Sequence, residues 1–189
     1  MASKVFVITG PSGVGKGTLI KELLSEVPNL ELSVSATTRA PREGEINGRD
    51  YHFLTPAEFE RRTDENDFLE WATYSGNRYG TLRSEVERRL EAGHSVVLEI
   101  EVQGAQQVRA AEPDSIQIFI APPDPAVLRE RLAGRGTDSQ EAIDERLKVA
   151  EQELAAQGDF NYCVVNDEVG RAAAELVGVI RRELDSTVE

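Results

Sequence analysis

The feature that most constrains this chain is a glycine-rich loop near its N-terminus, with the sequence Gly10-Pro11-Ser12-Gly13-Val14-Gly15-Lys16. The β-branched and aromatic run Val5–Thr9 before it predicts a buried strand, and apolar residues at helical spacing follow it over residues 19–27. In that context the glycines let successive backbone N–H groups converge on phosphate oxygens, and the helix N-terminus favours the same anion. Because Lys16 can neutralise the outer phosphates of a nucleotide, we predict a phosphate-binding loop.

The residue after Lys16 departs from the usual pattern. A Ser or Thr hydroxyl normally holds Mg²⁺ at this position, but the chain has Gly17 and carries the hydroxyl on Thr18. One residue is a rotation of about 100° around a helix, so the Thr18 hydroxyl need not reach the same point. Two arrangements stay open. Either Thr18 contacts a phosphate while nucleotide oxygens and waters hold Mg²⁺, or Glu99 or Glu101 orders those waters.

The rest of the sequence predicts an α/β fold. Strands are expected at residues 30–34, 95–101, 116–121 and 161–166, and helices at residues 81–91, 103–111, 126–133, 140–157 and 168–184. This alternation favours a parallel sheet with helices on both faces, and ligands bind such sheets at the carboxyl ends of the strands. Residues 36–80 are polar and rich in Arg, Gly and Asn, which indicates an inserted lobe around a ligand with a short helix at residues 56–62.

Length and charge limit the classes of function. The 189 residues suggest one compact unit, since domains average about 150 residues. A net charge of −13 argues against nucleic acid or an anionic membrane as partner. The absence of a long apolar run and of a signal-peptide pattern makes the cytoplasm the expected compartment. The single cysteine, Cys163, lies in an apolar run and is expected to be a buried, inert thiol.

Three classes of phosphate chemistry compete for this loop. A GTPase switch would need a base-reading Asn-Lys-x-Asp motif, which the chain lacks, and a large motor ATPase would need more chain. A small kinase fits the size and the polar lobe. There, Arg39 and Arg42 with nearby tyrosines suit a phosphomonoester, because guanidinium groups bind its oxygens in pairs. A solvated basic turn is the alternative for the two arginines.

Six segments, taken in order, carry a family resemblance: "SVSATTRAPREGEINGRDYHF", "FLEWATYSGNRYGT", "LEIEVQGA", "IFIAPP", "RLAGRGTDS" and "VVND". With the phosphate loop, they make the chain similar to guanylate kinases from about residue 4 to about residue 184. The resemblance implies a P-loop NTPase-type parallel sheet as the core (1–35, 81–124 and 156–189), an inserted GMP-binding lobe (36–80) and a helical lid (125–155). It also implies reversible transfer of the ATP γ-phosphoryl group to GMP or dGMP, with Mg²⁺ accompanying ATP.

The resemblance also implies roles for single residues. ATP would be bound by the phosphate loop together with Asn166, through Gly10, Pro11, Ser12, Gly13, Val14, Gly15, Lys16, Gly17 and Thr18. The GMP phosphate would be gripped by Arg39, Arg42, Tyr51 and Tyr79, and guanine would be read by Ser35, Glu70 and Thr81. The GMP site would be completed, facing the gap between the substrates, by Glu99 and Glu101, where the family usually has Asp in place of Glu101. Lys16 and the lid arginines Arg131, Arg135 and Arg146 would stabilise the transferring group, and Arg39 would join the catalytic set by holding the acceptor and offsetting repulsion between the two polyanions.

Glu70 also makes chemical sense by itself. Guanine offers two adjacent donors, N1–H and the 2-amino group, which one carboxylate can accept together, whereas adenine presents an unprotonated N1. A polar mismatch of this kind can discriminate by roughly 10⁴ or more. The plainer interpretation of Glu70 is a surface charge beside a core tryptophan, Trp71.

Two rival functions stay open. One is a nucleoside monophosphate kinase for another base, against which Glu70 and Ser35 argue. The other is a guanylate-kinase-like binding module without activity, against which the retained Lys16 and glycines argue. The expected partners are the small molecules ATP and GMP, with no nucleic acid and no membrane, and the chain is expected to be a monomer or a homodimer.

Overall fold

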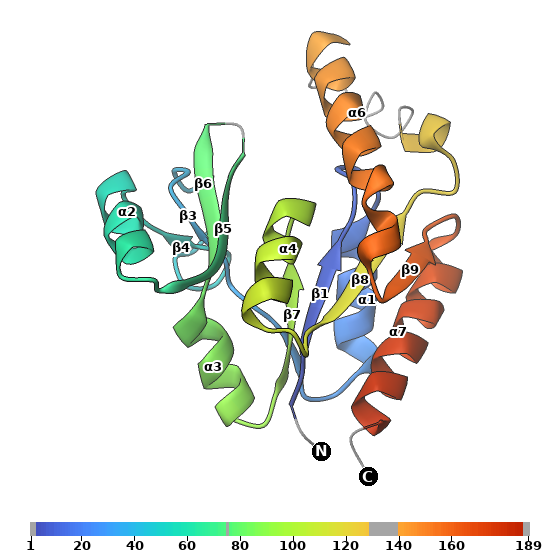
Figure 1. Cartoon of the computed structure of the whole chain (residues 1–189), viewed down its shortest axis with the longest axis horizontal. Coiled ribbons are helices and arrows are strands. Elements are labelled where there is room, and N and C mark those ends of the chain that lie inside the picture. Colours follow the sequence, from blue (N-terminus) through green and yellow to red (C-terminus); the bar gives the residue numbers. More distant parts are fainter. Residues whose placement is uncertain (1–2, 75, 129–139, 187–189) are drawn as a thin grey trace.

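The computed structural model describes residues 3–74, 76–128 and 140–186, in which strands form two sheets (Figure 1). The larger sheet contains β1 (Val5–Thr9), β2 (Leu30–Leu32), β7 (Ser95–Glu99), β8 (Ile116–Ala121) and β9 (Tyr162–Val165). Its strand order is β2-β7-β1-β8-β9, and every neighbouring pair is parallel. The predicted parallel sheet is therefore confirmed, and β1, which leads into the phosphate loop, lies at its centre.

Helices cover both faces of this sheet. Because successive strand residues point to opposite faces, Phe6 and Ile8 pack against α1 (Lys16–Glu26) and α7 (Val169–Asp185). Val5 and Val7 point the other way, to α3 (Arg83–Glu91) and α4 (Val102–Ala111). A further helix, α6 (Gln140–Ala155), followed by the 3-10 turn η1 (Gln157–Asp159), rises above the sheet in Figure 1. In the described part of the chain, no helix is long and apolar enough to cross a membrane.

The polar insertion folds around a second, smaller sheet. It contains β3 (Ala36–Thr37), β4 (His52–Phe53), β5 (Phe68–Tyr74) and β6 (Asn77–Leu82) in the order β4-β3-β6-β5, with β6 antiparallel to both neighbours. The helix α2 (Pro56–Asp64) begins at a capping box between Thr55 and Glu58 and has proline in its first turn. It buries Phe59, whose ring stacks on Phe68 with 4.3 Å between centroids.

Several predicted boundaries were wrong by a few residues. The helix expected from residue 81 begins at Arg83, because Thr81 and Leu82 pair with β5 and extend β6 instead. The strand expected over 95–101 ends at Glu99, where the chain turns into α4. The strand expected over 30–34 likewise ends at Leu32. Of the helix predicted over 126–133, residues 126–128 are helical, the helix begins one residue earlier at 125, and residues 129–133 lie outside the described residues.

The expectation of a buried cysteine was also wrong. Cys163 is exposed, although it pairs with Phe119 on the neighbouring strand. β9 is an edge strand, so α7 covers Val164 on one face while the side chain of Cys163 points to the other face. Partial desolvation by its neighbours, with the nearby charge of Glu175, still raises the pKa of its thiol, which opposes thiolate formation.

Candidate active site

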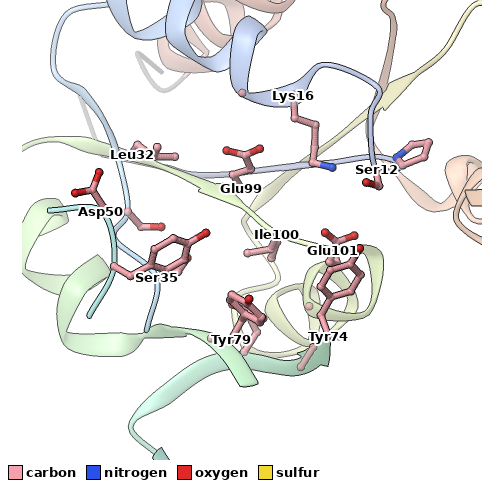
Figure 2. Close-up of a pocket in the computed structure, with 18 of the residues that line it drawn as sticks. Ser12, Lys16, Leu32, Ser35, Asp50, Tyr74, Tyr79, Glu99, Ile100 and Glu101 are labelled. Atoms are coloured by element: carbon pink, nitrogen blue, oxygen red, sulfur yellow. The ribbon is translucent and has the colours of Figure 1, made fainter. Parts of the chain in front are cut away.

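A cleft of about 680 Å³ separates the phosphate loop from the smaller sheet. Figure 2 shows Ser12 and Lys16 on one side, Ser35, Tyr74 and Tyr79 on the other, and Glu99 and Glu101 between them. Most of the residues predicted to bind substrates line this cleft: Pro11, Ser12, Gly13, Gly15, Lys16, Gly17, Thr18, Ser35, Tyr51, Glu70, Tyr79, Glu99 and Glu101. The cleft lies at the carboxyl ends of β1 and β7, as expected for a parallel sheet.

The phosphate loop has a backbone that only glycine tolerates at two points. Gly10 has φ 148°, and a Cβ there would lie 2.3 Å from the carbonyl oxygen of Ile120. Gly15 has φ 99°, and a Cβ there would lie 2.6 Å from Nδ2 of Asn166. These conformations turn the chain sharply between β1 and α1. Gly10 and the buried Val14 serve this geometry and do not line the cleft.

The N-terminus of α1 opens directly onto the cleft. Its N-cap is Gly15, and among the described residues no side chain accepts a cap hydrogen bond there and no acidic residue stands in the first turn. Lys16 instead donates a hydrogen bond from Nζ to the carbonyl oxygen of Gly10. The free backbone N–H groups and the ammonium group therefore form an anion-binding concavity.

Asn166 lies beneath the loop and not in the cleft. Its side chain is buried, and Nδ2 donates a 2.7 Å hydrogen bond to the carbonyl oxygen of Val14. This bond ties the end of β9 to the phosphate loop. Asn166 therefore stabilises the conformation of the phosphate loop.

Two carboxylates lie on the floor of the cleft, Glu99 at the last residue of β7 and Glu101 at the N-cap of α4. A Cβ at Gly17 would lie 4.0 Å from Oε1 of Glu99, so this carboxylate approaches the position where the usual hydroxyl is missing. Burial raises the pKa of Glu99, and the nearby Lys16 partly opposes that rise. Thr18 also lines the cleft and is exposed.

A third carboxyl group, which sequence reasoning missed, reaches the same floor from α6. Glu153 is buried and is hydrogen-bonded to Glu101. Burial, followed by the contact with Glu101, raises the pKa of Glu153, which favours its protonated form. An isolated glutamate on a helix carries no sequence signal for such a contact.

The far end of the cleft is formed around Glu70. Only 4% of this residue is exposed, and its Oε1 accepts a 2.7 Å hydrogen bond from the hydroxyl of Thr81. Burial raises the pKa of Glu70 to about 7, which outweighs the opposite effect of the hydrogen bonds from Thr81. The surface-charge interpretation of Glu70 is therefore wrong. Thr81 itself is fully buried behind Glu70 and does not line the cleft.

The arginines of the lobe are held by an internal carboxylate. Nη1 and Nη2 of Arg39 donate to the two oxygens of Glu45 at 3.0 and 2.8 Å, and the backbone N–H of Arg42 donates to the same carboxylate at 2.7 Å. The guanidinium of Arg39 lies 5.3 Å from the ring centroid of Tyr51, which in turn contacts Tyr79 edge to face. Glu45 thus occupies the fork that would bind a phosphate.

Some predicted residues are not brought to the cleft by what the structure describes. Arg131 and Arg135 lie outside the described residues, and only the backbone of Arg146 is described, within α6. The side chain of Arg42 is exposed. Conversely, the cleft is lined by residues to which sequence reasoning gave no role, among them Leu32, Asp50, Tyr74 and Gly104. Of these, only Gly104 carried a signal, because glycine inside a predicted helix is unfavourable without a local reason.

Comparisons with known proteins point to one family. The family model described as "Guanylate kinase" matches residues 2–183. A guanylate kinase of Rubrobacter xylanophilus is 53% identical over 95% of this chain and 94% of its own, and one of Synechocystis is 52% identical over 95% and 94%. A solved structure of guanylate kinase from Anaplasma phagocytophilum superposes with a TM-score of 0.78 at 32% identity, over 96% of this chain and 86% of that one.

Proposed function

The chain belongs to the guanylate kinase family, the ATP-dependent kinases of GMP, and we propose that it runs this reaction in the cleft between the phosphate loop and Glu70. One observation carries the proposal. A concavity for phosphates and a buried carboxylate suited to guanine face each other across a single space. ATP then binds through residues 10–18 and GMP through the smaller sheet, with their phosphates meeting between them.

Guanine is read by Glu70, whose two oxygens accept the N1–H and the 2-amino group. The buried position strengthens this recognition because an incoming base with no matching donors leaves the carboxylate unpaired and desolvated. Thr81 holds Oε1 from behind, and Ser35 lines the same end of the cleft. The family resemblance implies dGMP as a second acceptor, so dGMP is expected to be a substrate as well.

The phosphate of GMP is bound by Arg39 and Arg42 with Tyr51 and Tyr79. In this structure Glu45 accepts hydrogen bonds from both terminal nitrogens of the Arg39 guanidinium and from the backbone N–H of Arg42. A phosphate would use the same donors. Binding of GMP therefore exchanges one anion for another on the same donors. The tyrosines line the cleft and add neutral donors beside the guanidinium group.

The transfer itself needs no general base, because the attacking oxygen of GMP belongs to a phosphate that is already anionic. The enzyme must align two polyanions and neutralise charge as the γ-phosphoryl group moves. Lys16 leaves the carbonyl of Gly10 for the phosphates of ATP, and the loop N–H groups hold them. Arg131, Arg135 and Arg146 of the lid would add positive charge at the equatorial oxygens.

The donor groups present fit Mg²⁺ bound mainly through the nucleotide. Glu99 approaches the position of the missing hydroxyl at Gly17, and Glu101 lies beside it on the cleft floor. Mg²⁺ retains waters readily, so these carboxylates can hold it through water, with Thr18 as a further oxygen ligand. When bound, the ion would neutralise charge on the β- and γ-phosphates.

Water must be excluded during transfer, since an open site would hydrolyse ATP. We propose that the lobe (36–80) and the lid (125–155) move against the core (1–35, 81–124 and 156–189) when both substrates are bound. The contact of Glu153 with Glu101 supports this, because it already joins α6 to the cleft floor. We further propose a cytoplasmic enzyme, monomeric or homodimeric, without nucleic acid as partner, which the net charge of −13 supports.

The test is ADP production from Mg·ATP with GMP, dGMP, AMP, UMP and CMP offered separately. Fast turnover with GMP and dGMP alone is expected. Turnover with AMP or UMP would contradict the assignment of Glu70. Nucleotide binding without turnover of any acceptor would indicate a binding module, in which Gly17 and Glu101 disable the transfer.

A further inference from the structure

The guanine end of the cleft is closed by a position without a side chain. Gly104 stands on α4, which belongs to the core, and lines the cleft directly behind Glu70. A Cβ at Gly104 would lie 2.5 Å from Oε2 of Glu70, 3.2 Å from its Cδ and 3.4 Å from Cδ1 of Ile100. The first distance is far shorter than van der Waals contact, so any side chain at this position would collide with the carboxylate.

α4 cannot slide away to relieve such a collision. One turn further along the helix, the side-chain amide of Gln107 bonds twice to the backbone of β5. Its Nε2 donates to the carbonyl of Trp71 at 2.8 Å, and its Oε1 accepts from the N–H of Trp71 at 3.1 Å. Because Trp71 follows Glu70 on β5, this pair of bonds fixes Gly104 in register with the carboxylate.

Glu70 has little freedom to retreat. Thr81 holds its Oε1 from β6, and the residue is almost completely buried. On β6, a Cβ at Gly80 would lie 2.7 Å from the backbone oxygen of Glu70 on β5, so β5 and β6 are already in close contact. The open direction for the carboxylate is toward the cleft, where the base is proposed to bind.

We propose that Gly104 is a positioning residue for base specificity. Its missing side chain provides the space that seats the Glu70 carboxylate, and so fixes the depth at which guanine meets it. This inference rests on the proposed function, since it takes Glu70 as the group that reads guanine. It predicts that even one methyl group at position 104 impairs recognition of the base without touching the phosphate loop.

The first experiment compares Gly104→Ala with Gly178→Ala. Gly178 is also helical, in α7, and a Cβ there would meet nothing within 4 Å, so it is a matched control for helix propensity. Steady-state rates would be measured with GMP and with inosine monophosphate, which has the N1–H but lacks the 2-amino group. For Gly104→Ala, kcat/KM with GMP is expected to fall about 10- to 100-fold through KM, because the paired acceptor is displaced.

Three further readouts separate positioning from general damage. The preference for GMP over inosine monophosphate should narrow in Gly104→Ala, and KM for ATP should stay within about twofold. Tm is expected to fall by only a few degrees, because the better helix propensity of alanine partly offsets the cost of the close contact. Gly178→Ala should match the wild type in every rate. A Gly104→Ala enzyme that keeps the wild-type KM for GMP would overturn the inference.

The second experiment restores the space. Glu70→Asp withdraws the carboxylate by one methylene, and Gly104→Ala/Glu70→Asp combines the two changes. The double variant should regain at least about tenfold in kcat/KM for GMP over Gly104→Ala, a coupling typical of residues in contact. A loss that Glu70→Asp does not relieve would mean that position 104 acts on the fold alone and does not position the carboxylate. If the wild type itself fails to phosphorylate GMP, the proposed function falls and the inference with it.

Discussion

Under the proposed function, the two ends of the cleft recognise their ligands by opposite means. The phosphate end is formed by main chain: glycines with positive φ, free N–H groups at the start of α1, and one ammonium group that rests on a carbonyl. The base end is formed by a side chain, a nearly buried carboxylate whose charged form is disfavoured by its surroundings. The free-energy cost of the phosphate end is backbone strain. The cost of the base end is desolvation of the Glu70 carboxylate.

The difference follows from what each end must distinguish. Phosphate oxygens are alike in every nucleotide, so a cradle of backbone dipoles serves them without needing a particular side chain. Purine bases differ in which of their nitrogens carry protons. A buried hydrogen-bond acceptor therefore discriminates strongly against a base that lacks the matching donor. We therefore expect changes at the phosphate end to reduce turnover with all acceptors, and changes at the base end to alter the choice of acceptor.

The largest effect is expected at the phosphate end. Lys16→Met removes the ammonium group while keeping most of the side-chain volume, and should lower kcat by about 10³-fold, since a preorganised charge facing the transferring group is lost. Binding of GMP, measured by calorimetry without ATP, should change less than about threefold, because the base end is intact. Equal losses in kcat and in GMP binding would break the separation between the two ends.

A smaller but selective effect is expected from Glu70→Gln. The amide accepts one hydrogen bond from guanine and turns a donor toward the other, so kcat/KM for GMP should fall about 10²-fold. The rate with AMP should not fall, which narrows the preference for GMP. Glu60→Gln, on the exposed side of α2, is the matched control and should behave as wild type. An unchanged ratio of GMP to AMP turnover would remove Glu70 from base recognition.

The raised pKa of Glu70, about 7, predicts a pH dependence confined to the base end. The carboxylate must be ionised to accept from guanine, so below pH 7 GMP binding must expel a proton. Affinity should then fall by up to about tenfold per pH unit. Above pH 7 this group adds no further change. The measurement is Kd for GMP from pH 5.5 to 8 in the wild type and in Glu70→Gln. The phosphate of GMP ionises in both experiments, so the difference between the two profiles reports Glu70.

The same shift has a defined sign for stability. Because the pKa of Glu70 is raised above the ordinary value of 4.5, its contribution to stability is complete below that value and is lost as pH rises through about 7. Glu70→Gln should therefore raise Tm relative to wild type at pH 8 but not at pH 4.5. Parallel binding profiles, or a Tm difference independent of pH, would contradict a buried, titrating Glu70.

The smallest effect is expected where the lobe meets the acceptor phosphate. Glu45→Gln removes the anion that competes for Arg39 and the N–H of Arg42. Ion pairs in contact with solvent contribute little, so KM for GMP should fall by no more than about fivefold, with kcat little changed. Glu43→Gln, at a neighbouring exposed carboxylate, is the control. A rise in KM would show that Glu45 supports the arginines and does not compete for them.

The sequence predicted the two ends unequally. The phosphate loop is local, and its strand, glycines, lysine and helix stand within residues 5–26, so spacing alone predicted its geometry. The base end depends on contacts that spacing does not encode. Glu70 and Thr81 meet through the pairing of β5 with β6, strands that sequence reasoning did not predict. The parallel sheet was confirmed, because alternating apolar strands and helices determine it.

Side-chain contacts that no sequence pattern encodes account for the remaining misses. Glu153 reaches Glu101 from another helix, Gly104 stands behind Glu70 from the core, and Glu45 takes the fork of Arg39 within the lobe. Each depends on tertiary packing, for which a single sequence gives no periodic signal. The prediction that Cys163 is buried was wrong for a related reason. An apolar run in the sequence does not show that its strand lies at the edge of a sheet.

The uncapped start of α1 links the supply of nucleotide to the lifetime of the fold. With Gly15 as N-cap and no side chain of the described residues accepting from the first turn, the helix reaches its full hydrogen bonding when a phosphate arrives. A ligand at about 100 times its Kd adds about 2.7 kcal/mol to the free energy of unfolding. Loss of bound nucleotide would therefore raise the fraction of unfolded chain, the form that proteases cleave.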